Sequence, residues 1–282
     1  MTAREYHERT KHSYESIRRN AHYLDWDNYP RGFKIYPDLE AIRLPRDLTP
    51  SGIEALEAIG GKRRERAEPW TREALTHLLH FSAGTKGKRF RMAACTGALY
   101  EIELYVVCGA LEDLAAGVYH FGPGDLALRR LREGDWRGAL GPMPAASVYV
   151  VSTGTYWRNA WKYQARTYRH FGWDNGTILA NLVTMAGALG WKAEVCVGFV
   201  DREVNRLLGL DTEKEVALSV TAVGEAESQA ESLPEAPGEM DELRLATAPV
   251  SREEVDYPLM REAHAATELN NVEEVLRWRS RK

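Results

Sequence analysis

Apolar positions between residues 51 and 224 switch between the spacing of helices and the spacing of strands. The segments "SGIEALEAI" and "TREALTHLLHF" repeat apolar residues at helical intervals, and Thr71 is a suitable N-cap for the second. The segment from Glu101 to Cys108, "EIELYVVC", begins as an alternation and ends as a continuous apolar run. That pattern is typical of a strand buried on both faces.

The rest of this region continues the same interleaving. "GVYHF" and "LALRRLREG" flank "GPGD", which predicts a β-hairpin. Because strands and helices are interleaved but include a hairpin, the predicted fold class is α+β, with a mixed sheet flanked by helices. Further strands are expected in "ASVYVVST", "KAEVCVGF" and "VALSVTAVG", and further helices over 156–171, 174–189 and "DREVNRLLGL".

The segments outside this region have a different composition. Residues 1–50 are expected to be helical as far as about His22 and then extended, because four prolines between positions 30 and 50 forbid a long helix. Residues 225–250 are predicted to form an acidic linker or mobile arm, since "GEAESQAESLPEAPGEMDEL" holds seven acids and no base. A helical tail over 251–282 follows, which leaves 51–224 as the compact domain.

Charge and hydropathy exclude several classes of protein. The chain of 282 residues has a net charge of −4, and its cationic clusters "KRRER" and "KGKRFR" lack the repeated basic and aromatic positions of single-strand binders. No nucleic-acid partner is therefore expected. No window approaches the roughly 18 apolar residues of a membrane-spanning helix. The N-terminus has no apolar segment behind a basic start, so a cytoplasmic location is expected.

The cysteines and histidines form no recognisable metal-binding pattern. Cys95, Cys108 and Cys196 lack CxxC spacing, and no acid or cysteine at a suitable spacing completes a site around His77 and His80. We therefore expect reduced cysteines that lie mostly in the core, and no metal site.

The stretch "RNAWKYQARTYRHFGWDNG", residues 158–176, allows two interpretations. On a helix its cations fall near one line and its aromatic residues near two others, as in an ordinary helix with tryptophans inward and arginines in solvent. A buried tyrosine beside a cation could instead move a proton. Consecutive side chains point about 100° apart, so Lys162 and Tyr163 can share a pocket only at its edge or where the helix is irregular. The spacing alone leaves both interpretations open.

Six blocks occur in order along the chain: "YHERTKHS", "FKIYP", "TGALYEIELYVV", "WKYQARTYRHFGWDNGTILANL", "VGFVDREVNRLLGLD" with "VALSVTAVG", and "DYPLMREAHAATELNNVEEVLRWR". Together they resemble the SagB-type (thiazole/oxazole-forming) dehydrogenase branch of the FMN-dependent nitroreductase family. The resemblance extends from about residue 6 to residue 278 and implies a nitroreductase-like α+β fold, bound FMN and a homodimer with the flavin at the subunit interface. It also implies a peptide substrate, whose azoline rings are oxidised to azoles, and peptide-modifying partner enzymes.

The resemblance assigns roles to the Lys-Tyr pair of this stretch. A Lys-Tyr pair takes part in azoline oxidation in that branch, and here it is Lys162 and Tyr163. We expect Tyr163 to act as acid and base for the ring proton, with Lys162 as its electrostatic activator. Flavin N5 would accept the hydride, and dioxygen would reoxidise the flavin.

The resemblance also nominates residues for the flavin. Cys95, Thr96 and Gly97 match a small-residue loop that approaches the ring in the family, and "CVGF" matches a segment whose backbone reaches N5, which nominates Val197 and Gly198. The remaining candidates are arginines for the phosphate, namely Arg63, Arg64, Arg66 and Arg91.

The sequence departs from the family pattern at several of these positions. The arginine cluster lacks the usual serine, Cys95 replaces a serine, and Glu101 replaces a proline that is common after A-L-Y. Asp174 to Thr177 reads D-N-G-T where relatives often read D-A-G-H. Two alternatives therefore remain beside the azoline dehydrogenase: an NAD(P)H-dependent nitroreductase-like enzyme acting on a small acceptor, and a non-catalytic scaffold subunit of a peptide-modifying complex.

Overall fold

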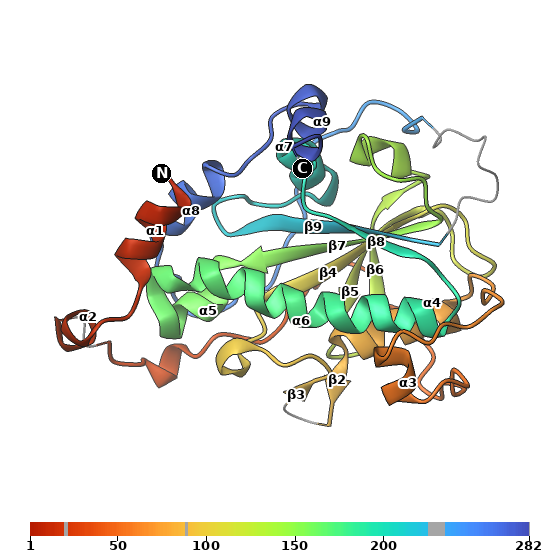
Figure 1. Cartoon of the computed structure of the whole chain (residues 1–282), viewed down its shortest axis with the longest axis horizontal. Coiled ribbons are helices and arrows are strands. Elements are labelled where there is room, and N and C mark those ends of the chain that lie inside the picture. Colours follow the sequence, from red (N-terminus) through yellow and green to blue (C-terminus); the bar gives the residue numbers. More distant parts are fainter. Residues whose placement is uncertain (20–21, 88–89, 225–234, 282) are drawn as a thin grey trace.

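The computed structural model describes residues 1–19, 22–87, 90–224 and 235–281. Its centre is a seven-stranded sheet in the order β1-β6-β5-β4-β7-β9-β8, and a short hairpin lies apart from it (Figure 1). The sheet strands are β1 (Ile42–Arg43), β4 (Ile102–Cys108), β5 (Gly117–Gly122), β6 (Ala127–Glu133), β7 (Val148–Thr155), β8 (Ala193–Cys196) and β9 (Glu215–Val223), and the hairpin consists of β2 (Thr85–Lys86) and β3 (Phe90–Arg91).

Helices cover both faces of this sheet, which confirms the α+β class. Every pair of neighbouring strands is antiparallel, so the sheet is antiparallel where the sequence suggested a mixed one. The helices are α1 (Ala3–Thr10), α2 (Tyr14–Arg19), α3 (Ala55–Ile59), α4 (Arg72–Ala83), α5 (Tyr156–Tyr163), α6 (Thr167–Ala188), α7 (Asp201–Leu208), α8 (Pro258–Ala265) and α9 (Val272–Arg279).

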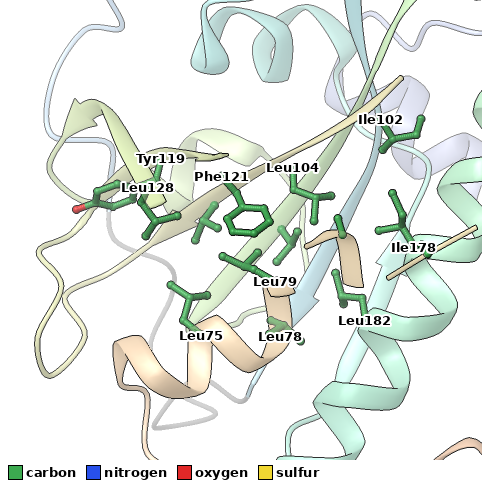
Figure 2. Packing of buried hydrophobic residues seen from close by; sticks show 14 of the residues in the cluster. Leu75, Leu78, Leu79, Ile102, Leu104, Tyr119, Phe121, Leu128, Ile178 and Leu182 are labelled. Atoms are coloured by element: carbon green, nitrogen blue, oxygen red, sulfur yellow. The ribbon is translucent and has the colours of Figure 1, made fainter. Parts of the chain in front are cut away.

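The sheet separates two hydrophobic clusters. On one face, α4 and α6 pack leucines such as Leu79 and Leu182 against Leu104 and Phe121 of the sheet (Figure 2). On the other face, α7 packs onto side chains such as Tyr105. Strand β4 is buried along its whole length, as its sequence predicts. Each fully buried leucine contributes roughly 1.5–3 kcal/mol of transfer free energy, so these layers fix the position of α6.

The helix break in the stretch 158–176 lies earlier than the sequence suggests. We expected one helix to end near Phe171 and another to begin near Asp174, but α5 ends at Tyr163 and α6 continues through Gly172 and Gly176. The break coincides with Gln164, whose φ is 51°. Helix α1 packs on this junction, because the Tyr6 hydroxyl donates to the Ala165 carbonyl and Arg166 donates to the Thr10 carbonyl. Tertiary contacts with the N-terminal helix thus satisfy the backbone where the helix is interrupted.

The N-terminal and C-terminal segments lie side by side over the domain. Arg31 N donates to Val250 O at 2.8 Å, and Ala248 N donates to Ile35 O at 3.0 Å. Helices α1 and α8 are also neighbours (Figure 1). The expected extended segment after residue 22 is present, interrupted by a single short 3₁₀ turn from Trp26 to Asn28.

The acidic segment falls partly outside the described residues, because 225–234 are not among them. Residues 235–250 form no helix or strand, yet Met240 and Leu243 pack against the second cluster, and Arg132 donates to the Asp241 carbonyl. The domain boundaries remain predictions. Among the described residues, no helix combines the length and apolarity needed to cross a bilayer.

Candidate functional site

Lys162 and Tyr163 occupy the irregular end of α5. The helix ends at Tyr163, and the following residue, Gln164, has a positive φ. Lys162 is exposed and Tyr163 is half-buried, and the Lys162 Nζ lies 5.3 Å from the centroid of the tyrosine ring. The two consecutive side chains therefore come together at a helix irregularity, which is one of the two arrangements that the sequence left open.

The ring of Tyr163 lies directly against Gly97 of the 95–97 loop. A Cβ added to Gly97 would lie 2.9 Å from Tyr163 Oη and 3.0 Å from Cε2. Gly97 also has φ 69°, in the left-handed region that glycine adopts without strain. Both observations explain why this position is glycine, and they place the proposed catalytic tyrosine on the proposed flavin loop.

His170 and Asn159 fix this arrangement from the other side. The His170 ring stands edge-on to the Tyr163 ring, with centroids 4.7 Å apart. His170 Nδ1 donates to Asn159 Oδ1 at 2.7 Å, and Asn159 Nδ2 donates to Thr96 O at 3.2 Å. Burial lowers the pKa of His170 to about 4, so its imidazole is neutral at neutral pH. Asn159 thereby connects α6, α5 and the loop through one buried side chain.

The polar groups of Cys95 and Thr96 point towards α6. Thr96 N and Oγ1 each donate to the carboxylate of Asp174 at 2.9 Å. The Cys95 thiol lies 3.1 Å from Glu101 Oε2 and 3.2 Å from Asp174 Oδ2. Burial, followed by the charges of the two acids, raises the pKa of Cys95, and burial raises that of Glu101. Both donors of Thr96 are thus already engaged within the chain.

Arg91 is buried rather than exposed to solvent. Its guanidinium donates to the carbonyls of Gly32 and Ile102 and lies 5.2 Å from the centroid of the Tyr100 ring. Those contacts tie the extended N-terminal segment to β4.

The other three phosphate candidates lie at the far end of α6. Arg63, Arg64 and Arg66 are exposed, Arg64 N donates to Gly187 O at 3.0 Å, and the Arg64 side chain pairs with Glu68. At 1.5 Å per residue, Gly187 is about 20 Å along α6 from Asp174, which holds the 95–97 loop. One chain therefore does not bring the arginine cluster to Tyr163.

Val197 and Gly198 follow β8 at the edge of the sheet. Val197 is 57% exposed. Gly198 lies under Trp278 of α9, because a Cβ there would come within 2.6 Å of the indole, and Arg279 donates to the Gly198 carbonyl at 2.7 Å. This segment is connected to the 95–97 loop through β9 and α6. Cys196 pairs with Val220 of β9, and the neighbouring Ser219 hydroxyl accepts from Asn175 Nδ2. Asn175 follows Asp174, which binds the loop.

Sequence reasoning did not predict the position of Arg158. One of the two interpretations of residues 158–176 put the arginines in solvent, but Arg158 is fully buried and donates to Glu103 Oε1 at 2.6 Å and to the Tyr100 carbonyl at 2.7 Å. Burial by itself raises the pKa of Glu103, but Arg158 and His120 outweigh that effect and hold it far below the usual value. A buried charge has no apolar signature in a sequence, so only its partner across the fold reveals it.

Asp174, Glu101, Asn159 and His170 also take part in the site, although none was a sequence candidate for catalysis or binding. The sequence analysis noted Glu101 only as a departure from the family pattern, and Asp174 only as the first residue of the segment D-N-G-T. Asn159 and His170 carried no sequence signal. Asn159 contacts Thr96, more than 60 residues earlier in the chain, and His170 reaches the loop only through Asn159.

The comparison with protein families identifies one match. The profile of the Nitroreductase family matches residues 63–225, which is more than half of the chain. This range includes the 95–97 loop, Lys162, Tyr163 and the segment at Gly198.

One characterised relative is similar over part of the chain. It is the microcin B17-processing protein McbC of Escherichia coli, 30% identical over 161 residues, which cover 51% of this chain and 58% of McbC. The present chain thus matches little more than half of the length of that relative.

Solved structures resemble the chain over more of its length. A nitroreductase-like protein from Anabaena variabilis is 26% identical with a TM-score of 0.70, and the match covers 95% of this chain and 55% of that one. A chain of the E. coli microcin synthetase McbBCD complex with truncated pro-MccB17 bound is 22% identical with a TM-score of 0.51, covering 79% of this chain and 87% of that one. The latter likeness supports the fold alone.

Proposed function

The chain belongs to the nitroreductase family of oxidoreductases, and we propose that it is an FMN-dependent, SagB-type dehydrogenase that oxidises azoline rings of a ribosomal peptide to azoles. The observation that carries this proposal is the placement of Tyr163 between Lys162 and the glycine of the 95–97 loop. The 30% identity with a microcin B17-processing protein supports a peptide substrate.

The residues around Tyr163 fit a flat redox ring. Gly97 offers bare backbone next to the phenol, because a Cβ there would lie 2.9 Å from Tyr163 Oη, and Val197 and Gly176 are both exposed. We propose that the backbone at Gly97 and at Val197–Gly198 would hold the ring, and that the exposed guanidinium groups of Arg63 and Arg66 would hold the phosphate. Arg91 fits this role less well because its donors are already used inside the chain.

The separation of these groups supports a homodimer. The arginine cluster and the 95–97 loop contact parts of α6 that are about 20 Å apart along the helix. A single cofactor that uses both would need the arginines of one subunit and the loop of the other. We therefore propose that two copies of the chain complete each site.

The proposed reaction removes two hydrogens from the azoline ring, one as a proton and one with its electron pair. Tyr163 Oη would take the proton, because it is the acid-base group held in position by Gly97 and His170. Lys162 would stabilise the negative charge on that oxygen before the proton arrives. When bound, FMN supplies the two-electron acceptor for the hydride.

An exposed aromatic surface next to Lys162 would suit a peptide. Trp26 and Tyr29 stack on each other, and both pack edge-on against Trp161, the residue before Lys162. Trp26 is 68% exposed and Tyr29 is 47% exposed. We propose that the peptide flanking the reacting ring passes over this surface, because grouped exposed aromatic side chains are typical of binding sites.

The test is oxidation of an azoline-containing peptide by the purified protein, with the bound flavin identified by chromatography. We expect Lys162→Ala and Tyr163→Phe to retain FMN and to lose azole formation by 100-fold or more. The matched controls are Lys11→Ala and Tyr14→Phe, which alter an exposed lysine and an exposed tyrosine of the N-terminal segment.

Three results would contradict the proposal. Unchanged rates in Lys162→Ala and Tyr163→Phe would remove the assigned roles. Bleaching of the flavin by NADPH without oxygen, together with no action on the peptide, would favour a nitroreductase-like enzyme with a small acceptor. A colourless protein that binds no FMN would favour a scaffold subunit.

A further inference from the structure

Cys95 and Glu101 are two positions at which the sequence departs from the pattern of the family branch that it resembles, and they meet in the folded protein. Cys95 Sγ lies 3.1 Å from Glu101 Oε2, and 3.2 Å from Asp174 Oδ2 of α6. One ligand atom of each residue lies within 4.8 Å of the other two. A serine and a proline at positions 95 and 101 could not make this cluster, so the two departures together create it.

We propose that Cys95, Glu101 and Asp174 form a binding site for a divalent transition-metal ion, with Zn²⁺ as the best match. A thiolate together with two carboxylates suits Zn²⁺, whereas Mg²⁺ and Ca²⁺ prefer ligands that are oxygen alone. The sequence by itself predicts no metal site, because Cys95 and Glu101 have no recognisable ligand spacing and Asp174 lies more than 70 residues later in the chain.

The distances within the cluster are close to those of a tetrahedral zinc site. With Zn–S of about 2.3 Å and Zn–O of about 2.0 Å, the sulfur and oxygen ligands of a tetrahedral ion lie about 3.5 Å apart. The sulfur-to-oxygen distances of 3.1 and 3.2 Å are shorter by only a few tenths of an ångström. Small side-chain movements would therefore admit the ion without a change of the backbone.

Glu101 supplies an independent indication of a missing ligand. Its side chain is fully buried, and its Oε1 atom has no hydrogen-bond partner among the described residues. Buried polar atoms of native proteins are normally partnered, so this one calls for an explanation. An ion held by both carboxylate oxygens of Glu101 would provide it, because the oxygen that faces Cys95 is Oε2.

A small cavity, lined mainly by apolar side chains, lies beside Cys95 and Asp174 of the cluster but does not reach Glu101. It has a volume of about 10 Å³ and is lined by Cys95, Asp174 and Arg91, among others. This volume holds about one water molecule. The nearby Arg91 is directed to the carbonyls of Gly32 and Ile102. Three protein ligands and a water are a common zinc coordination.

Backbone and side-chain donors already orient the proposed ligands. Thr96 N and Oγ1 hold the Asp174 carboxylate, and Tyr100 N donates to Cys95 Sγ at 3.0 Å. Such outer contacts are typical of metal ligands and fix their direction. The ion would join the 95–97 loop and the residue before β4 to α6, directly behind Gly97.

The test measures metal binding on the full-length protein as purified, whatever its flavin content. After treatment with a chelator and buffer exchange, Zn²⁺ is returned, its content is measured by mass spectrometry, and its affinity is measured against a chromophoric chelator. We expect one Zn²⁺ per chain, with at least tenfold weaker binding in Cys95→Ala and in Glu101→Gln. The matched controls are Cys196→Ala and Glu203→Gln, which remove a thiol and a carboxylate outside the cluster.

A second measurement covers the case in which a variant does not fold. In the wild-type protein, Zn²⁺ should protect Cys95 from an alkylating reagent, as read by peptide mass spectrometry, and Co²⁺ should produce a thiolate-to-metal absorption in the difference spectrum. No bound metal, equal affinity in the cluster variants and the controls, or no protection of Cys95 would each overturn the proposal. Because metal content is measured without reference to flavin or turnover, these results are separate from the test of the dehydrogenase.

Discussion

The phenol oxygen of Tyr163 lies 2.9 Å from the position that a Cβ of Gly97 would occupy. Substitution of Gly97 by alanine must therefore displace the ring, and it also places a side chain at φ 69°. We expect Gly97→Ala to destabilise the fold by about 2 kcal/mol and to lower azole formation at least tenfold. Urea unfolding and the peptide assay measure these two effects.

The control for this glycine is Gly172→Ala. Gly172 lies in α6 with no atom within 4 Å of its added Cβ, so alanine should stabilise the helix by about 0.5–1 kcal/mol. In a double variant with Tyr163→Ala, the loss caused by Gly97→Ala should shrink, since the clash is gone. Equal losses with and without Tyr163 would show that the contact does not limit this position.

The buried pair of Arg158 and Glu103 should be more important for stability than any exposed ion pair. Arg158→Met leaves the Glu103 carboxylate in the core without its main partner, and we expect a loss of about 3–5 kcal/mol in the free energy of unfolding. Arg130→Met, which breaks an exposed pair with Glu133, should change it by less than about 1 kcal/mol. A loss in Arg158→Met no larger than that of the control would contradict the assignment, and Arg158→Met/Glu103→Gln should recover part of the loss.

Trp278 covers the backbone that we propose for flavin contact. If Gly198 reaches the ring, the indole must move first, because it lies 2.6 Å from a Cβ at Gly198. We expect FMN to bind several-fold faster to the flavin-free Trp278→Ala variant than to the flavin-free wild type. Quenching of flavin fluorescence measures the rate. Leu276→Ala, an exposed apolar side chain on the same helix, should not alter that rate. Equal rates in all three proteins would remove Gly198 from the site.

Asp201 should make the stability of the protein depend on pH. Burial raises its pKa from 3.8 to about 6, although Leu269 N donates to its carboxylate. A folded-state pKa above the unfolded value gives a contribution that is complete below pH 3.8 and is lost as the pH rises through 6. We expect this loss to be about 2 kcal/mol between pH 4 and pH 7.

The measurement compares urea unfolding of the wild type with Asp201→Asn at four or more pH values. Asparagine still accepts from Leu269 N but does not titrate, so the variant should lack this pH-dependent component. The free energy of unfolding of the variant minus that of the wild type should therefore be more positive at pH 7 than at pH 4. Asp211→Asn is the matched control, because Asp211 also accepts one backbone N–H but is exposed. A constant difference between wild type and Asp201→Asn across this range would contradict the shift.

Local features of the fold could be predicted well because they depend on neighbouring residues. Thr71 caps α4 through its side chain, as expected, and β4 is buried at every position. The hairpin of β5 and β6 forms around "GPGD". In each case a pattern within about ten residues carries the information, because caps, turns and strand burial are decided by short-range geometry.

Features that join distant segments were missed or misplaced. The end of α5 at Tyr163 depends on α1, which contacts the carbonyl of Ala165. The burial of Arg158 depends on Glu103, and an arginine in a sequence gives no sign of such a partner. The separation of Arg63 from the 95–97 loop depends on the length and position of α6.

The sequence by itself therefore determined the α+β class, the order of the elements, the resemblance to a flavoenzyme family, and Lys162 and Tyr163 as the residues to test. Only the tertiary structure decided that Tyr163 meets Gly97, that Arg158 is buried, and that Cys95, Glu101 and Asp174 form one cluster. The physical reason is that periodicity reports which side of an element is apolar. A site depends instead on which polar groups from separate elements the packed core brings within contact distance.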